Sequence, residues 1–167
     1  MNESNSKRTI GNDSTVFRPA KNSEISSIQK VVFSILSEYG LKADPDHTDF
    51  DLSDLDKFYF SKGGYFEVCE MNNQIVGTWG LFPVAHRTCE LRKMYLLPNY
   101  RGLGLGKQMI ERALAKGREL NFTRMELETA SVLNEAISLY KSYGFRPISK
   151  HELCNRCDQA FELLLSE

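Results

Sequence analysis

A glycine-rich segment in the middle of the chain has residue types that could bind a phosphate group. It lies between a strand-like run and an amphipathic helical pattern, and it reads Arg101-Gly102-Leu103-Gly104-Leu105-Gly106-Lys107. The start of a helix leaves backbone N–H groups unpaired, and glycines let an anion approach them closely. We therefore predict a pyrophosphate cradle here, to which Arg101 and Lys107 add charge-assisted contacts.

The glycine spacing separates this segment from two other phosphate-binding motifs. A P-loop has Ser or Thr after its lysine, whereas Lys107 is followed by Gln108. A dinucleotide-binding fingerprint needs a further glycine at the position that Lys107 occupies. The remaining pattern is R-x-x-G-x-G, formed by Arg101, Gly104 and Gly106. Taken alone, this pattern leaves open a glycine-rich turn that binds nothing.

Two other segments give the glycine loop a family context. The first is 90–98, and the second reads Asn134-Glu135-Ala136-Ile137-Ser138-Leu139-Tyr140-Lys141-Ser142-Tyr143-Gly144-Phe145. With the loop between them, they resemble the fourth strand and the motif N-x-x-A-x-x-L-Y-x-x-x-G-F of the GNAT superfamily, the acetyl-CoA-dependent N-acetyltransferases. The resemblance extends over residues 16–150 in element order. The acidic segment 44–59 and Arg156-Cys157-Asp158 also resemble small stand-alone members.

The resemblance implies where acetyl-CoA would lie. The R-x-x-G-x-G loop would join the fourth strand to the third helix and bind the coenzyme A pyrophosphate. Backbone groups of Met94, Tyr95 and Leu96 would pair with the pantetheine arm as if it were an added strand. Asn134 would contact the cofactor, or else cap the helix that it begins. The acceptor amine would then attack the thioester directly in a ternary complex, with no covalent enzyme intermediate.

Two side chains match catalytic positions of the family. Glu90 matches a glutamate that accepts the proton of the amine, and its alternative role is a strand-end carboxylate paired with Arg92. Tyr140 matches a tyrosine that protonates or hydrogen-bonds the leaving thiolate, and its alternative role is a core aromatic residue. A non-catalytic module that binds or senses acyl-CoA is the alternative to an enzyme. The presence of both Glu90 and Tyr140 favours the enzyme.

The acceptor is predicted only as a primary amine of a small molecule or peptide. One acidic stretch contains no Lys or Arg between its aspartates, which are Asp44, Asp46, Asp49, Asp51, Asp54 and Asp56. A carboxylate-rich rim would favour a cationic amine. The alternative is that these aspartates are solvated turn and cap residues.

The elements that must position these residues follow from hydrophobic periodicity. The pattern predicts an α/β fold, in which a mixed sheet of about seven strands is flanked by about four helices. Predicted strands span 16–19, 65–70, 74–82, 88–97, 125–128, 145–148 and 160–165, and helices begin near 23, 53, 104 and 134. Asn22 or Ser23 would cap the first helix and Ser53 the second. The GNAT resemblance adds that the fourth and fifth strands splay apart.

Length and charge limit the remaining possibilities. A chain of 167 residues favours one domain, predicted to span 16–167 after a flexible tail of residues 1–15. The net charge of −1 provides no positive field for nucleic acid or an anionic membrane. The partners expected are acetyl-CoA and the acceptor, and a homodimer is possible. With no apolar run of a signal peptide or membrane span, we expect a cytoplasmic location.

Four cysteines raise the question of a metal or redox site. In a reducing compartment Cys69, Cys89, Cys154 and Cys157 would be thiols. Cys154 and Cys157 form a C-x-x-C near His151, but a zinc site needs about four ligands and the sequence has no second such pair. A thioredoxin-like motif would open a helix near the N-terminus. We therefore expect ordinary loop or strand cysteines with no metal or redox role.

Overall fold

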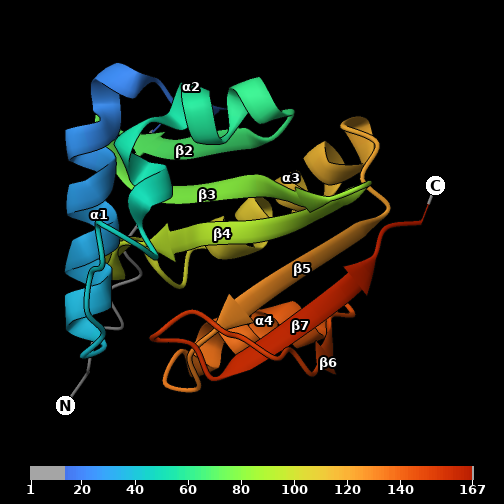
Figure 1. Ribbon diagram of the computed structural model, residues 1–167. Coiled ribbons are helices and arrows are strands. Elements are labelled where there is room, and N and C mark those ends of the chain that lie inside the picture. Colours follow the sequence, from blue (N-terminus) through green and yellow to red (C-terminus); the bar gives the residue numbers. More distant parts are fainter. Residues whose placement is uncertain (1–13, 167) are drawn as a thin grey trace, which may run out of the picture.

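Seven strands form one mixed sheet, described here by a computed structural model that covers residues 14–166. The order across the sheet is β1-β2-β3-β4-β5-β7-β6 (Figure 1). The β4–β5 pair is parallel and the other pairs are antiparallel. The strands are β1 (Thr15–Pro19), β2 (Tyr65–Met71), β3 (Gln74–Ala85), β4 (Thr88–Leu96), β5 (Arg124–Thr129), β6 (Arg146–Ile148) and β7 (Gln159–Leu164).

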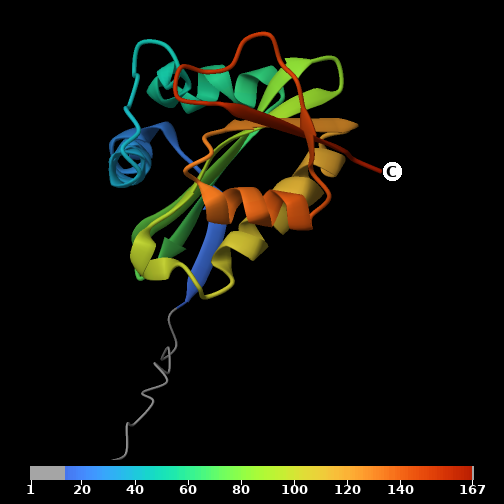
Figure 2. The same cartoon turned by 90° about the horizontal axis from the view of Figure 1, so that it is seen from below.

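Four α-helices cover the two faces of this sheet. α1 (Ile25–Glu38) and α2 (Leu55–Phe58) lie on one face, and α3 (Leu105–Glu119) and α4 (Asn134–Ser142) lie on the other (Figure 2). Each long helix buries residues at helical spacing. From α1 these include Ile28, Val32 and Leu36, and from α3 Met109, Ile110 and Ala113. The two buried sets belong to separate hydrophobic clusters on either side of the sheet.

The neighbouring strands β4 and β5 separate along their length. They pair only where Thr88–Glu90 lie beside Arg124–Glu126, at the start of both strands. Beyond this point the ribbons diverge (Figure 1). β4 also bends there, because Lys93 has a φ of +54° at the place where its register with β3 shifts. This local disruption is a β-bulge, and it increases the twist of β4. The predicted splaying of the two strands is thus confirmed.

The predicted α/β fold is confirmed, and its strand and helix boundaries agree within a few residues. The predicted caps are wrong. Asp54, not Ser53, caps α2 by accepting a bond from the Lys57 N–H at 3.0 Å. Neither Asn22 nor Ser23 caps α1, because Glu24 holds its N-cap position. The Asn22 side-chain oxygen instead accepts the Leu55 N–H at 2.8 Å and so joins the turn before α1 to α2.

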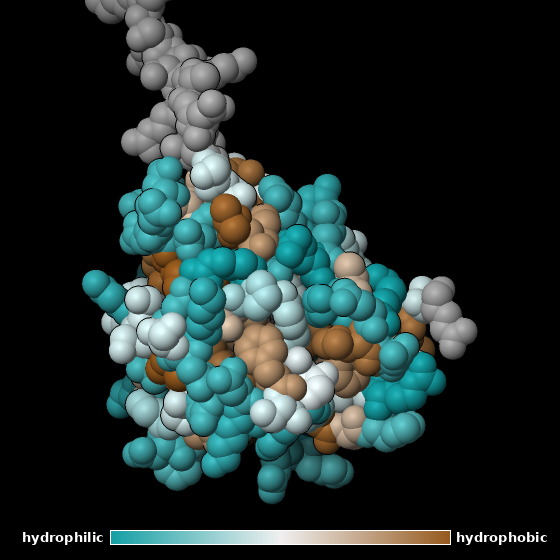
Figure 3. Space-filling view, turned by 90° about the horizontal axis from the view of Figure 1, so that it is seen from above, coloured by the Kyte–Doolittle hydropathy of each residue, from teal (hydrophilic) through white to brown (hydrophobic). Residues whose placement is uncertain are grey.

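The last residue of the predicted tail, Thr15, belongs to β1, and residues 1–13 lie outside the described residues. No helix within residues 14–166 has the length and apolar character needed to cross a membrane. On the face seen in Figure 3, hydrophobic residues form small patches between hydrophilic ones.

Candidate functional site

A cavity of about 490 Å³ lies at the diverging ends of β4 and β5. It brings together residues from the acidic segment, β4, the glycine loop, α4 and the β6–β7 connection. Among the predicted site residues, the cavity is lined by Glu90, Met94, Tyr95, Leu96, Arg101, Gly102, Gly104, Gly106, Lys107 and Tyr140. Most of the predicted site residues therefore line one cavity, although other residues supply the larger part of its wall.

Three predicted site residues do not line the cavity. Leu103 points to solvent with 44% of its surface exposed, and Leu105 is buried with Met71 and Val76. Asn134 is exposed at the first position of α4, where its side chain makes no capping bond, so the capping role is wrong. Four residues separate Asn134 from Leu139, one fewer than in the family motif, which weakens the match of Asn134. Its contact with a cofactor stays a prediction.

The glycine loop forms an open helix start. Gly102 and Gly104 have φ values of +76° and +82°, in the region that favours glycine. Gly104 precedes α3, and no side chain among the described residues 14–166 caps this end of the helix. The N–H groups of the first turn therefore lack a side-chain partner, as anion binding requires. Gly106 leaves space beside them, because a Cβ there would meet only Leu139, at 3.8 Å.

The Arg101 side chain is held by its own protein. Its two terminal nitrogens lie 2.7 and 2.9 Å from the carboxylate oxygens of Glu38, at the end of α1. Its Nε donates to the Leu96 carbonyl at 2.9 Å. Arg101 thus ties the glycine loop to α1 and to the end of β4. Its predicted contact with a phosphate stays a prediction.

Glu90 lies at the point where β4 and β5 begin to separate. It is 7% exposed, faces the cavity and pairs in register with Glu126. Arg92 donates through Nε to Glu90 Oε1 at 2.7 Å, and the ammonium of Lys150 lies 3.9 Å from Oε2. Both predicted features are therefore present, because the carboxylate pairs with Arg92 and also reaches the cavity.

Tyr140 contributes a phenol to the cavity from α4. Its ring packs against Phe145 at 5.8 Å, and the side chain is buried but lines the cavity. Burial raises the pKa of Tyr140, and the nearby Tyr95 raises it further. The phenol is therefore neutral at physiological pH and can donate a hydrogen bond. The core and site interpretations of Tyr140 are both compatible with this position.

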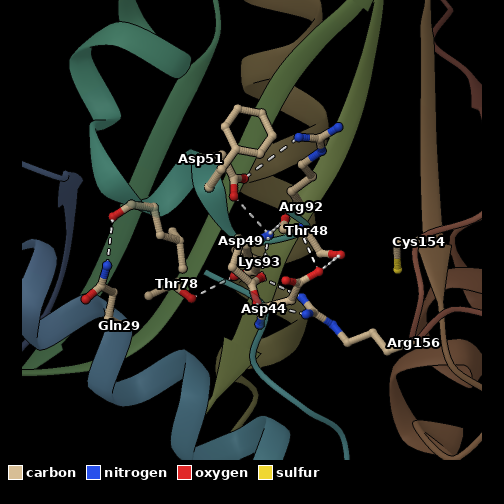
Figure 4. A network of polar contacts seen from close by, with 12 residues as sticks. Gln29, Asp44, Thr48, Asp49, Asp51, Thr78, Arg92, Lys93, Cys154 and Arg156 are labelled. Atoms are coloured by element: carbon tan, nitrogen blue, oxygen red, sulfur yellow. Dashed lines mark hydrogen bonds and ion pairs between the residues drawn. The ribbon is translucent and has the colours of Figure 1, made fainter. Parts of the chain in front are cut away.

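A network of buried charges supports the bulge of β4 (Figure 4). The Lys93 ammonium lies 3.1 Å from Asp49 and 3.2 Å from Asp51, and both carboxylates are fully buried. Arg156 binds both Asp49 oxygens, at 2.7 and 2.8 Å. Tyr59 donates to Asp51. The acidic segment and the β6–β7 connection are in this way fastened to the same place on β4.

Asp49 is ionised in this network although it is buried. Burial by itself would raise the pKa of its carboxyl, but the bonds from Arg156 and the charge of Lys93 outweigh it and lower the pKa. A buried pair of this kind is costly to break, because one charge would be left without compensation.

The network decides between the two interpretations of the acidic stretch. Asp44 accepts bonds from Thr48, and Asp54 caps α2, so these two are turn and cap residues. Asp49 and Asp51 are instead neutralised internally by Lys93 and Arg156, while Asp46 and Asp56 are exposed. These aspartates therefore do not form a rim of free carboxylates that faces an acceptor. The neutralising cations are distant in sequence, so no local pattern could have indicated them.

The cysteine prediction needs correction. Cys154 and Cys157 form a disulfide, with their Cα atoms 5.1 Å apart. The Cys157 N–H donates to the Cys154 carbonyl at 2.9 Å, and this tight turn brings the two side chains within bonding distance. Cys69 and Cys89 are free and buried, as expected of core thiols.

Comparison with known proteins places this geometry in a family. The Acetyltransferase (GNAT) family matches residues 30–145, which is more than half of the 167-residue chain. The chain belongs to the GNAT family. It is therefore an acyltransferase, and the predicted resemblance is confirmed. The matched region includes β2 to β5, the glycine loop and α4, and so contains most of the cavity wall.

Individual GNAT relatives agree with this assignment. Uncharacterized N-acetyltransferase YjgM of Escherichia coli K12 is 38% identical over 144 residues, which cover 83% of this chain and 86% of that protein. Human N-acetyltransferase 8B is 31% identical over 102 residues, or 58% of this chain and 45% of that protein. The shared region with the human protein is thus less than half of its length.

Solved GNAT structures share the fold. An acetyltransferase from Staphylococcus aureus Mu50 has a TM-score of 0.86 at 24% identity, covering 92% of this chain and all of that one. YncA of Salmonella typhimurium, described as a putative acetyltransferase with its cofactor acetyl-CoA, has a TM-score of 0.72 at 19% identity, covering 92% of this chain and 95% of that one. At 24% and 19% sequence identity, these similarities show a shared fold.

The charge network predicts a stability change in Asp49→Asn. This variant leaves Lys93 and Arg156 without their shared carboxylate, and we expect a loss of about 3–5 kcal/mol at pH 7. Because the pKa of Asp49 is lowered from its ordinary value of 3.8, its stabilisation is present above that pH and disappears as the pH falls through the lowered pKa. The difference in the free energy of unfolding between Asp49→Asn and the parent should therefore become smaller below about pH 4.

Urea denaturation at neutral and acidic pH measures this difference. The control is Asp46→Asn, at an exposed position, which should change the free energy of unfolding by no more than about 0.5 kcal/mol. The network would be contradicted if Asp49→Asn lost as little free energy of unfolding as the control. It would also be contradicted if the loss stayed the same at acidic pH.

Proposed function

We propose that this GNAT protein transfers an acetyl group from acetyl-CoA to a primary amine of a small molecule or peptide. The observation that carries the proposal is that one cavity is lined by an open helix start and also by a carboxylate, Glu90, and a phenol, Tyr140. An anion site and a proton-transfer site on one continuous wall suit a phosphate-bearing thioester and an amine that must lose a proton.

The cofactor would lie along the unpaired edge of β4. The pyrophosphate would accept bonds from the first turn of α3, assisted by Lys107, whose side chain is exposed at the loop. The pantetheine arm would run beside Met94, Tyr95 and Leu96, on the side from which β5 has departed. Strand-like pairing of that kind fixes the thioester without any movement of the sheet.

The chemistry needs one proton to be removed and one bond to be broken. An acceptor amine attacks the thioester carbonyl, Glu90 accepts the proton of the amine directly or through water, and the carbon–sulfur bond breaks. Tyr140 donates a hydrogen bond to the departing thiolate. Because the pKa of Tyr140 is raised, while that of a thiol is about 8.5, hydrogen bonding is favoured over complete proton transfer.

The cradle is tested by the pair Gly106→Glu and Gly106→Gln. The Gly106 backbone is helical and a side chain has room there, so both variants should fold. The glutamate adds a negative charge beside the pyrophosphate, whereas glutamine adds a side chain of the same size without charge. We expect calorimetry to show coenzyme A affinity falling at least about tenfold further in Gly106→Glu than in Gly106→Gln. If the two variants bound coenzyme A with equal affinity, the pyrophosphate would lie elsewhere.

The role of Glu90 is tested by Glu90→Gln. Loss of a general base should lower the rate of acetyl transfer by about 10²- to 10⁴-fold, with acetyl-CoA affinity retained. The defect should shrink at high pH, where more of the amine is already neutral. The matched control is Glu126→Gln, at the β5 position that pairs with Glu90 but does not line the cavity. If the pH–rate profiles of the parent and Glu90→Gln ran parallel with a small constant offset, Glu90 would not be the general base.

The role of Tyr140 is tested by Tyr140→Phe. The ring still fills its place against Phe145, so we expect acetyl-CoA affinity to hold while turnover falls by about 10²-fold. Tyr143→Phe is the matched control, because it removes a hydroxyl that bonds to Glu111 at 2.7 Å outside the cavity. If both variants kept the parental turnover with chemistry rate-limiting, Tyr140 would be a packing residue only.

A further inference from the structure

The β6–β7 connection brings two sulfur atoms to a carboxylate that the acetyl transfer does not use. Cys154 and Cys157 lie in this connection, and Glu128 lies near the end of β5. All three side chains are partly exposed and line the cavity. One sulfur from each cysteine and a Glu128 oxygen lie within 4.8 Å of one another. Three donor atoms therefore converge on one small region of the wall.

This donor set suits a thiophilic cation. Two cysteines in a C-x-x-C and one carboxylate are ordinary zinc ligands, and sites with three protein ligands keep a fourth position open for water or another ligand. In the oxidised protein the sulfurs are bonded to each other and cannot serve. We propose that, once the disulfide is reduced, Cys154, Cys157 and Glu128 bind one divalent cation of the zinc class at the cavity wall.

The backbone around the sulfurs is held by contacts other than the disulfide. The Cys157 N–H bonds to the Cys154 carbonyl at 2.9 Å, and the Cys154 N–H donates to Glu128 Oε1 at 2.8 Å. Between the cysteines, Arg156 is fixed to Asp49, and after them the Asp158 N–H donates to the Thr129 carbonyl at 3.0 Å. These contacts keep both cysteines beside Glu128 after reduction, so the two sulfurs need only move apart from their bonded positions to bind one cation.

The charges and protons of the step balance. A dithiol or phosphine reductant supplies two electrons, and two protons convert the disulfide to two thiols. Cation binding then releases both thiol protons to solvent. The bound state holds two thiolates and one carboxylate against a divalent cation and Lys150, whose ammonium lies 3.3 Å from Glu128 Oε2. Lys150 and the Cys154 N–H also orient the carboxylate, which keeps free lone pairs for a metal.

The other two cysteines differ from this pair. Burial raises the pKa of Cys69 to about 11 and that of Cys89 to about 12. Both thiols therefore stay protonated at neutral pH, whereas a cysteine that binds a metal must be a thiolate. Metal binding at Cys154 and Cys157 does not depend on the proposed acetyl transfer, and it can be measured without any substrate.

Cobalt titration of the full chain tests the site. Co²⁺ substitutes for Zn²⁺ and gives a thiolate-to-cobalt absorption that reports cysteine ligands. After reduction and removal of the reductant under anaerobic conditions, the parent should bind about one equivalent of Co²⁺, and Zn²⁺ should displace it. The oxidised protein should give no such absorption. A reduced, folded parent that shows no thiolate-to-cobalt absorption would overturn the proposal.

Variants identify the ligands. We expect Cys157→Ser and Glu128→Gln each to weaken Co²⁺ binding by at least about tenfold. Glu126→Gln is the matched control for the carboxylate, because Glu126 contacts Lys150 from the same strand at 3.6 Å but is not in the donor group. Cys69→Ala is the control for the thiol. Thermal melts without metal establish that each variant is folded. Parental affinity in Glu128→Gln or in Cys157→Ser would contradict the three-ligand site.

Discussion

The cavity depends on the separation of β4 and β5 after a short parallel pairing. Because they pair only from Thr88 to Glu90, the rest of β4 has a free edge toward the cavity in the described part of the chain. The bulge at Lys93 turns that edge, and the glycine loop follows at its end. Glu90, the free strand edge and the open helix start thus follow one another in the chain and all line the cavity.

Holding such an edge open requires support from elsewhere in the chain. The buried contacts of Lys93 with Asp49 and Asp51 supply it, and Arg156 extends the network to the β6–β7 connection. Charges buried at this depth tolerate few arrangements, because each needs its partners in place. The acidic segment and the β6–β7 connection are therefore positioned by electrostatics as much as by apolar packing.

Residues suited to two kinds of chemistry line the same cavity. Glu90 and Tyr140 suit proton transfer and hydrogen bonding to a reacting thioester, whereas Cys154 and Cys157 face Glu128 on the neighbouring β5 strand. Lys150 lies within 3.9 Å of both Glu90 and Glu128, so one ammonium touches the two groups. A change in the charge at Glu128 would consequently be felt at Glu90 through Lys150.

The sequence by itself determined the fold class, the order of the elements and the parts of the cavity wall that β4 and the glycine loop supply. Periodicity and glycine spacing are local properties, so the strands, α3 and the loop from Arg101 to Lys107 could be predicted. Tertiary structure alone decided that Glu38 engages Arg101, that Lys93 and Arg156 neutralise Asp49, and that Cys154 and Cys157 are joined beside Glu128. Ion pairs and metal donors depend on distances between residues far apart in the chain, and only the packed sheet sets those distances.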